Sequence, residues 1–478
     1  MDSVFFYDFK ESLLDNEDVK FRHFCIFGHS IHLVFLDSMT SKTDLGHLVI
    51  RPMLSATELP EDEEMLLEYL ENSVISAADT KVIYDIEKAK QQLFGGCALI
   101  FAGNLSKVLY ADIRMYPFRA VSSPDIEVSE YGSRESFIEV LNVNISMITR
   151  RLKTDTLRFE NLNVGSTTNT RVVLCYLEDK APKKLVDEMR KTLVSSNLSE
   201  IFEAGSLKEI LQKRENTLYN TLGMTVRPDV LSSKLSEGRV AVMAEGSPEA
   251  VFAPYLLIEH LQTPDDYVNR PYFALLTRTV KLISIMLSIG LIGTYIALAQ
   301  YNPEVFPSSI IYSIMNSAVS TPFSAATESV FLLLLYEMMR EAGMRLPKSM
   351  GQSVSIVGSL VIGEAVVSAG LIGAPTVIVC ALSAIASFIT PDLYNQTSVL
   401  RILYIIVGTV SGIYGIALLS VFLFVGLCSV KSFSVPIVSP FAPFDKKGIR
   451  DSLFRFNYKK LGKKTADVNS FTGSDDEI

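Results

Sequence analysis

The chain has 478 residues and a formal net charge of −9, from 53 acidic and 44 basic side chains. This acidic balance argues against general nucleic-acid binding, which needs clustered Lys and Arg to neutralise phosphates. Hydrophobic residues make up 48% of the chain, and they are concentrated in residues 275–430, where charges are few. The composition therefore predicts a globular N-terminal part followed by an apolar membrane part.

The cysteines and histidines do not form a recognisable metal or disulfide pattern. The five cysteines are scattered without a CxxC pair, which favours reduced structural thiols. His23, His29 and His32 are close in sequence, but half-buried strand histidines explain them better than a metal site does. We find no dinucleotide-binding glycines, no Walker loop and no nucleophile–base pattern, so we predict no catalytic residue, metal or cofactor.

The N-terminal part predicts two α/β lobes, at residues 1–125 and 126–270, joined by a connector. In the first lobe, strand-like runs at 23–28 and 32–37 precede an acidic amphipathic helix at 58–74. A hairpin follows at 97–113. The second lobe repeats this mixture of strands and helices, but we detect no sequence repeat.

The second lobe also has clear strand and helix signals. Strands are predicted at 157–165 and 171–179, and a helix at 181–196 has Pro182 near its start, where a missing N–H costs little. Residues 238–255 have a strand–turn–strand pattern with Gly and Pro at the turn. The N-terminus lacks a basic region followed by an apolar run, so we predict that the lobes are cytoplasmic.

Residues 271–430 predict an all-α multispan transmembrane domain, followed by a cytoplasmic, largely disordered tail at 431–478. The run 272–299 is long enough to cross a hydrocarbon core of ~30 Å at ~1.5 Å per residue. The run 308–320 is too short for a span and is predicted to be interfacial or re-entrant. Another apolar helix is predicted at 326–339.

The remaining apolar runs lie at 353–372, 374–390 and 402–428. The last is predicted to be one long span, in which Gly408, Gly412 and Gly415 permit close helix contact. These runs allow four to six crossings in total.

Basic residues give conflicting signals about topology. The positive-inside rule places Arg270, Lys281, Arg340, Arg345 and Lys348 on the cytoplasmic side, and also the basic tail. Arg401, at the start of the last predicted span, prefers the same side as the tail. One long helix cannot have both ends inside, so either Arg401 is an exception or a segment is re-entrant.

Glu364 is the strongest functional signal, because a carboxylate in mid-membrane costs about 3 kcal/mol or more and usually faces a bundle interior or a water-filled path. At 100° per residue, Glu364 shares one stripe with three other residues, and the four are predicted to line a pore: Ser353, Val357, Glu364 and Ser368. The opposite side carries small residues predicted to pack against another helix: Ser355, Ser359, Gly363 and Gly370. The alternative for Glu364 is a structural hydrogen bond to a neighbouring helix.

Other carboxylates in the membrane part allow either a structural or a functional interpretation. Glu328 lies near a predicted helix start, where it can act as a cap or as an ion site. Glu337, Arg340 and Glu341 lie at helical spacing and can pair with one another, and a solvated helix end explains them best.

The segment 340–393, which begins REAGMRLPKSMGQ, closely resembles the A subunit of the GerA family of spore germinant receptors. Upstream, RPD at 227–229, GRVA at 238–241 and TPDDY at 263–267 are similar to elements of the same family. The resemblance covers about residues 130–445, and the first 110 residues share only its general character.

The resemblance implies a multi-pass protein of the spore inner membrane, in contact with membrane lipid. It implies as partners a multispan B subunit that binds the nutrient and a C-subunit lipoprotein. It further implies a homo-oligomer that forms a nutrient-gated channel for monovalent cations, with the pore lined from Gln352 onward. Some relatives carry Gln where this chain has Glu364. Two alternatives stay open: a signalling scaffold that relays nutrient binding without forming a pore, and a paralogous A-like subunit of the dipicolinate-release system.

Overall fold

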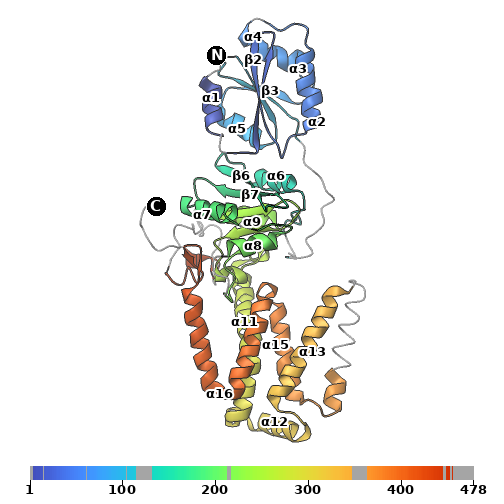
Figure 1. Ribbon diagram of the computed structural model, residues 1–478, viewed down its shortest axis with the longest axis vertical. Coiled ribbons are helices and arrows are strands. Elements are labelled where there is room, and N and C mark those ends of the chain that lie inside the picture. Colours follow the sequence, from blue (N-terminus) through green and yellow to red (C-terminus); the bar gives the residue numbers. More distant parts are fainter. Residues whose placement is uncertain are drawn as a thin grey trace.

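The computed structural model describes residues 4–13, 16–60, 62–103, 105–114, 127, 132–196, 198–212, 217–346, 363–444, 448–452 and 455. Figure 1 shows two α/β lobes stacked end to end above a helical part. The predicted boundary between the lobes, at 125/126, lies outside the described residues.

The first lobe is built on a five-stranded antiparallel sheet. Its strands are β1 (Val19–Ile26), β2 (His29–Leu36), β3 (Thr80–Ile83), β4 (Ala98–Ala102) and β5 (Val108–Ala111), in the order β1-β2-β4-β5-β3. Its helices are α1 (Val4–Glu11), α2 (Lys42–Asp44), η1 (Leu45–Ile50), α3 (Arg51–Ser55), α4 (Glu63–Tyr69), η2 (Leu70–Val74) and α5 (Ile86–Phe94). The predicted hairpin at 97–113 is β4 and β5, which pair antiparallel.

The second lobe has the same plan. Its strands are β6 (Leu157–Val164), β7 (Thr170–Leu177), β8 (Gly223–Thr225), β9 (Val240–Ala244) and β10 (Ala250–Ala253), in the order β6-β7-β9-β10-β8. Its helices are α6 (Leu141–Arg151), α7 (Lys183–Val194), α8 (Ala204–Leu211) and α9 (Pro228–Ser236). If the strands of each lobe are counted from one, both sheets follow the order 1-2-4-5-3. The lobes are thus a structural repeat, although their sequences show none.

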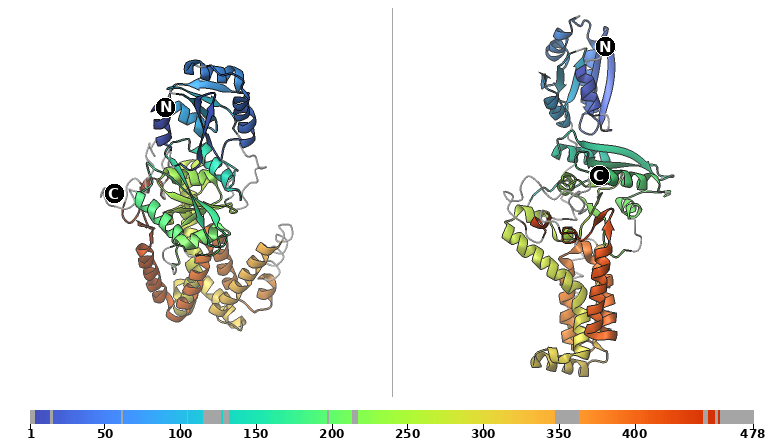
Figure 2. Two further views of the ribbon diagram at one scale, coloured as in Figure 1. Left: turned by 45° about the horizontal axis from the view of Figure 1, so that its top comes forward. Right: turned by 90° about the vertical axis from the view of Figure 1, so that its left-hand side faces the viewer.

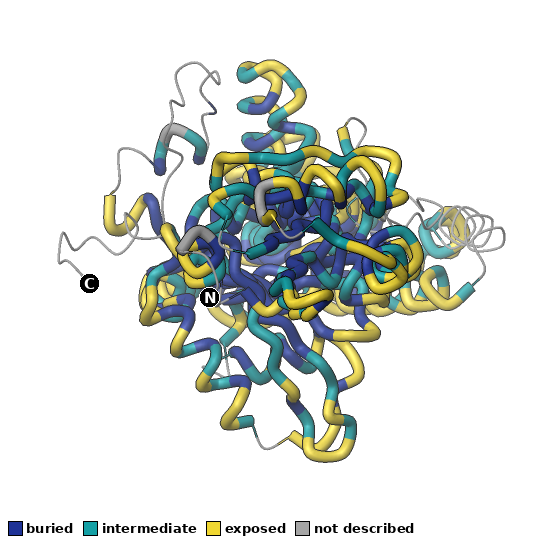
Figure 3. Tube along the Cα trace, turned by 90° about the horizontal axis from the view of Figure 1, so that it is seen from above, coloured by how far each residue is buried: buried dark blue, intermediate teal, exposed yellow. Residues whose placement is uncertain are grey.

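Helices cover both faces of each sheet, and this explains the apolar strands. In the second lobe, α7 and α8 pack on one face, and α6 and α9 pack on the other. Strand β9 is therefore buried along its whole length and has no polar alternation. Seen from above, the buried positions lie at the centre of the molecule (Figure 3). The predicted α/β class of the soluble region is confirmed.

The two lobes are joined by polar contacts as well as by the chain. The Asn16 side-chain amide donates to the carbonyl of Leu157 at 3.0 Å, and Lys90 pairs with Asp155 at 2.7 Å. The stacking of the lobes is visible from two further sides in Figure 2.

The membrane part consists of apolar helices below the second lobe. They are α11 (Pro271–Tyr301), η4 (Pro303–Val305), α12 (Ser308–Ser320), α13 (Ala325–Arg345), α15 (Ala374–Phe388), η5 (Pro391–Leu393) and α16 (Tyr394–Ser429). In length and composition, α11 and the stretch Pro391–Ser429 are sufficient to cross a membrane. Helices α12 and α13 meet at 80° and together are a third candidate, either a broken span or a re-entrant loop.

The single span predicted at 402–428 is wrong, because α16 folds back on itself. Gly412 has φ 59° and ψ −151°, which is not helical. The Tyr404 hydroxyl lies 2.8 Å from the Ser420 hydroxyl, whereas residues 16 apart in a straight helix are separated by about 24 Å along its axis. Figure 1 shows the two arms side by side, with the turn at the end far from the lobes.

Both ends of α16 therefore lie near the second lobe. The Gln396 side chain donates to Asn220 at 2.8 Å, and Tyr219 donates to the carbonyl of Leu423 at 2.9 Å. This removes the topological conflict, since the start of α16 lies at the same end of the bundle as β11 (Lys431–Ser432) and β12 (Val435–Pro436), where the tail begins. Arg401 is also a poor topology marker, because it is buried in the bundle and its Nε donates to the carbonyl of Ser288 at 2.8 Å.

Glycines bring α11 and α16 into close contact, as predicted for Gly408. A Cβ at Gly408 would lie 2.5 Å from the carbonyl oxygen of Gly293, so no larger residue fits without moving one helix.

We expect Gly412→Ala to destabilise the membrane part. Its backbone conformation is accessible almost only to glycine, so the substitution should cost on the order of 1–3 kcal/mol. A Cβ there would also lie 2.9 Å from the Tyr301 ring. Thermal unfolding of the full chain in detergent measures the effect. The control is Gly426→Ala, where a Cβ meets nothing within 4 Å; equal melting temperatures for the two variants would refute the role of Gly412.

Candidate functional site

Half of the predicted pore and packing residues lie outside the described part of the chain. These are Ser353 and Val357 of the pore stripe, and Ser355 and Ser359 of the packing side. The other residues lie on a short helix at 363–368 and in the turn that follows it.

In this short helix, Glu364 and Ser368 are exposed, whereas Gly363 and Gly370 are half-buried. The turn after the helix contains Gly370, whose φ of 64° favours glycine. Glu364 therefore faces away from the chain's own bundle and has room for a neighbouring subunit or for water. The assignment of these four residues to a pore stripe and a packing side remains a prediction.

The segment after Gly370 is held by Glu328, which is buried near the start of α13. Its Oε2 accepts a hydrogen bond from the backbone N–H of Gly373 at 3.2 Å and one from the Thr376 hydroxyl at 2.7 Å. Gly373 and Thr376 form the N-terminus of α15, where unpaired N–H groups and the helix dipole favour a negative charge. Glu328 thus caps the neighbouring helix, while Ser324 caps its own.

The Glu328 contact joins several helices at the end of the bundle far from the lobes. The Thr376 hydroxyl lies 3.4 Å from the Tyr295 hydroxyl of α11. From α12, Ser317 approaches Gly373 so closely that a Cβ at Gly373 would overlap the Ser317 hydroxyl. Helices α11, α12, α13 and α15 therefore meet where the segment 363–370 ends.

At the opposite end of α13, Glu337 is more than part of a solvated helix end. Its carboxylate accepts a hydrogen bond from the Tyr394 hydroxyl at 2.6 Å and pairs with Arg340 at 3.1 Å. The Arg340 guanidinium lies 3.8 Å from the centre of the Tyr394 ring, in cation–π contact. These contacts attach α13 to the start of α16.

The three upstream motifs that carry the family resemblance each supply a buried charge to the second lobe or its base. In RPD, Arg227 is buried and pairs with Asp229 at 2.8 Å. In GRVA, buried Arg239 pairs with buried Glu259. Burial by itself lowers the pKa of Arg239, but the nearby carboxylates of Glu259 and Glu237 have the larger effect. The pKa of Arg239 is therefore raised.

The third motif, TPDDY, begins the chain's entry into the membrane. Helix α10 (Pro264–Val268) starts with a capping box formed by Thr263 and Asp266. The Asp266 carboxylate also accepts from Arg278 Nε on α11 at 3.0 Å. Arg278 is 0% exposed and Asp266 is 3% exposed, so this ion pair is shielded from water.

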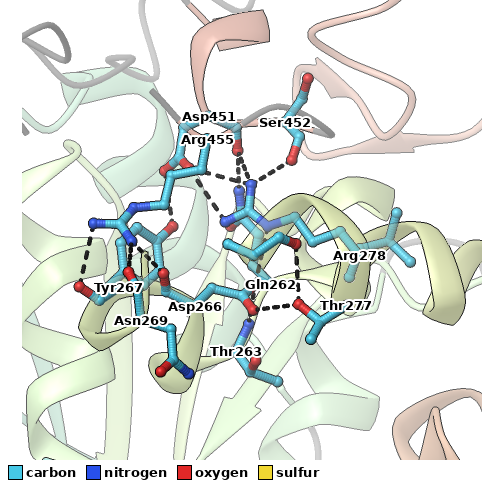
Figure 4. A network of polar contacts seen from close by, with 12 residues as sticks. Gln262, Thr263, Asp266, Tyr267, Asn269, Thr277, Arg278, Asp451, Ser452 and Arg455 are labelled. Atoms are coloured by element: carbon cyan, nitrogen blue, oxygen red, sulfur yellow. Dashed lines mark hydrogen bonds and ion pairs between the residues drawn. The ribbon is translucent and has the colours of Figure 1, made fainter. Parts of the chain in front are cut away.

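The C-terminal segment completes this network (Figure 4). Arg278 donates from Nη1 to the Asp451 carbonyl at 3.0 Å and from Nη2 to the Asp451 carboxylate at 3.2 Å. The Tyr267 hydroxyl donates to the same carboxylate at 2.8 Å. Burial, and then the charge of Asp451, raise the pKa of Tyr267 well above its usual value, so the phenol stays protonated as a donor.

The residues of this juxtamembrane network were only partly visible in the sequence. Arg278 is a charge near the front of the predicted apolar run 272–299, but Asp451 lies in a tail predicted to be largely disordered. The described part of that tail is folded: β11 (Lys431–Ser432) and β12 (Val435–Pro436) form a hairpin, and η6 (Gly448–Arg450) precedes Asp451. The TPDDY motif was the available signal for Asp266.

Apolar helices below a pair of α/β lobes define a membrane protein with a bilobed soluble domain. The family model described as Bacillus/Clostridium GerA spore germination protein matches residues 7–466 of this chain. The chain therefore belongs to the GerA family, which confirms the resemblance seen at 340–393.

Curated relatives include spore germination protein KA of Bacillus subtilis, 33% identical over 89% of this chain and 78% of that protein. Spore germination protein B1 of the same organism is 31% identical over 93% of this chain and 92% of that protein. Among solved structures, the N-terminal domain of the A subunit of the Bacillus megaterium spore germinant receptor GerK3 matches at 24% identity. That match covers 53% of this chain and 94% of the other, with a TM-score of 0.41.

We expect Glu328→Ala to destabilise the bundle more than Glu328→Gln. Glutamine keeps an oxygen that accepts from Gly373 and Thr376, whereas alanine removes the acceptor of both groups and leaves the buried N–H of Gly373 without it, at about 1–3 kcal/mol. The measurement is the thermal stability of the purified full chain in detergent. If the two variants melt at the same temperature, the carboxylate does not cap α15.

Proposed function

We propose that this chain is the A subunit of a spore germinant receptor, and that copies of it form a nutrient-gated cation channel in the spore inner membrane. Its proposed partners are a multispan B subunit that binds the nutrient and a C-subunit lipoprotein. The family supports the role in germination, since its curated relatives are named as spore germination proteins.

The observation that carries the channel proposal is the placement of Glu364. This carboxylate lies in an apolar segment, yet it is exposed and faces away from the bundle of its own chain. A charge in that position needs water or partners. In a ring of subunits, repeated carboxylates provide both, because they surround an aqueous path and attract cations.

The anchoring of the neighbouring segment supports the same proposal. Glu328 fixes Gly373 and Thr376 only a few residues after Glu364. The segment that carries Glu364 is therefore attached to α15 at one end, while its exposed side is available for contacts between subunits. The alternative is a scaffold that relays nutrient binding through the lobes and only anchors them in the membrane.

The test is Glu364→Gln in the full receptor, measured as K⁺ release from spores and as conductance after reconstitution. We expect a lower flux or a weaker preference for cations, because glutamine keeps the size of the side chain and removes its charge. Glu341→Gln is the matched control, since Glu341 forms an exposed pair with Arg345 at the end of α13. A Glu364→Gln receptor that assembles normally and conducts as before would favour the scaffold.

A further inference from the structure

We propose that the C-terminal segment around Asp451 is a latch that couples the second lobe to α11, and that Asp451 is a positioning residue for channel gating. The gating role rests on the proposed function, whereas the latch itself is a property of this chain alone. The latch comprises Asp451, Ser452 and Arg455 on one side, and residues 262–278 on the other.

Asp451 contacts both the lobe side and the membrane side of the junction. Its carbonyl accepts from the Gln262 side chain at 2.7 Å and from Arg278 at 3.0 Å. Its carboxylate accepts from Tyr267 at 2.8 Å and from Arg278 at 3.2 Å. Asp451, in the C-terminal segment, thus joins the exit of the lobe, the linker helix α10 and the first membrane helix.

Arg455 strengthens the same junction by binding backbone carbonyls at the end of α10. Its guanidinium donates to the carbonyls of Asn269 at 2.7 Å and Tyr267 at 3.2 Å, and also to that of Asp266. Carbonyls at a helix C-terminus lack partners within the helix and attract cations. Arg455 therefore acts as a cap supplied from a distant part of the chain.

The latch also connects the first membrane helix to the last. The chain leaves α16 through β11 and β12, where the backbone N–H of Leu257 donates to the carbonyl of Ile437 at 2.8 Å. Val435 packs with Leu256, Ile258 and Leu261 of the second lobe. Since α11 and α16 also touch at Gly293 and Gly408, a shift of the lobe reaches both helices through this junction.

The charges allow the latch to open without unfolding the junction. Arg278 is fully buried, and a buried charge needs a partner. Asp266 supplies one from the adjacent helix α10, independently of the C-terminal segment. If Asp451 withdraws, Arg278 therefore remains paired. The junction can then exist in two arrangements, one with Asp451 bound to Arg278 and one without it. A coupling element needs two such states.

The latch itself is tested by hydrogen exchange on the purified full chain in detergent. Asp451→Asn keeps the shape of the side chain and removes its charge, so amides at 264–278 should exchange on the order of tenfold faster, as expected for loss of a charged hydrogen bond. The Asp44→Asn variant in the first lobe is the matched control. Unchanged exchange at 264–278 would overturn the latch.

The gating role is tested in spores that carry the full receptor. The probe is a serial dilution of a mixture of amino acids, sugars and nucleosides. Asp451→Asn should raise the concentration needed for half-maximal K⁺ release on the order of fivefold, in the range of typical coupling between sites. Maximal release should be unchanged, and Asp451→Glu should restore sensitivity.

These outcomes separate the two proposals. Faster exchange with unchanged sensitivity would overturn the gating role and leave the latch. Reduced maximal release with unchanged sensitivity would mean that Asp451 acts only on assembly, which also overturns the gating role. Failure of the Glu364→Gln test alone would reject the channel, while the exchange result would still decide the latch.

Discussion

The architecture depends on one buried cation, the guanidinium of Arg278, at the point where the chain passes from the second lobe into the membrane. Its side chain has no exposed surface, and its partners come from α10 and from the C-terminal segment, 173 residues further along the chain. Because a buried charge needs a partner, Arg278 joins α11 to α10 through Asp266 and to the C-terminal segment through Asp451. Figure 4 shows this convergence.

Two carboxylates join helices at opposite ends of the membrane bundle. Glu328 caps α15 at the end far from the lobes, and Glu337 holds the start of α16 at the near end. Between them, Arg401 donates to the carbonyl of Ser288, and glycines bring α11 and α16 together at Gly293 and Gly408.

The strands of the second lobe show which elements the local sequence pattern can predict. The runs at 157–165, 171–179 and 238–255 were predicted as strands and are β6, β7, β9 and β10. The three-residue strand β8 was not, because it is too short to show a period. The shared order 1-2-4-5-3 was also invisible, since strand order depends on which segments meet in space.

The sequence by itself determined the division into soluble and membrane parts, the α/β class of the lobes and the GerA family, because composition, periodicity and motifs are local properties of the chain. Only the tertiary structure decided that α16 turns back at Gly412 and that Glu328 caps a neighbouring helix. It also decided that Asp451 pairs with Arg278. The reason is physical, because each of these contacts joins residues remote in sequence. The sequence does not show which distant residue a carboxylate or an arginine will contact.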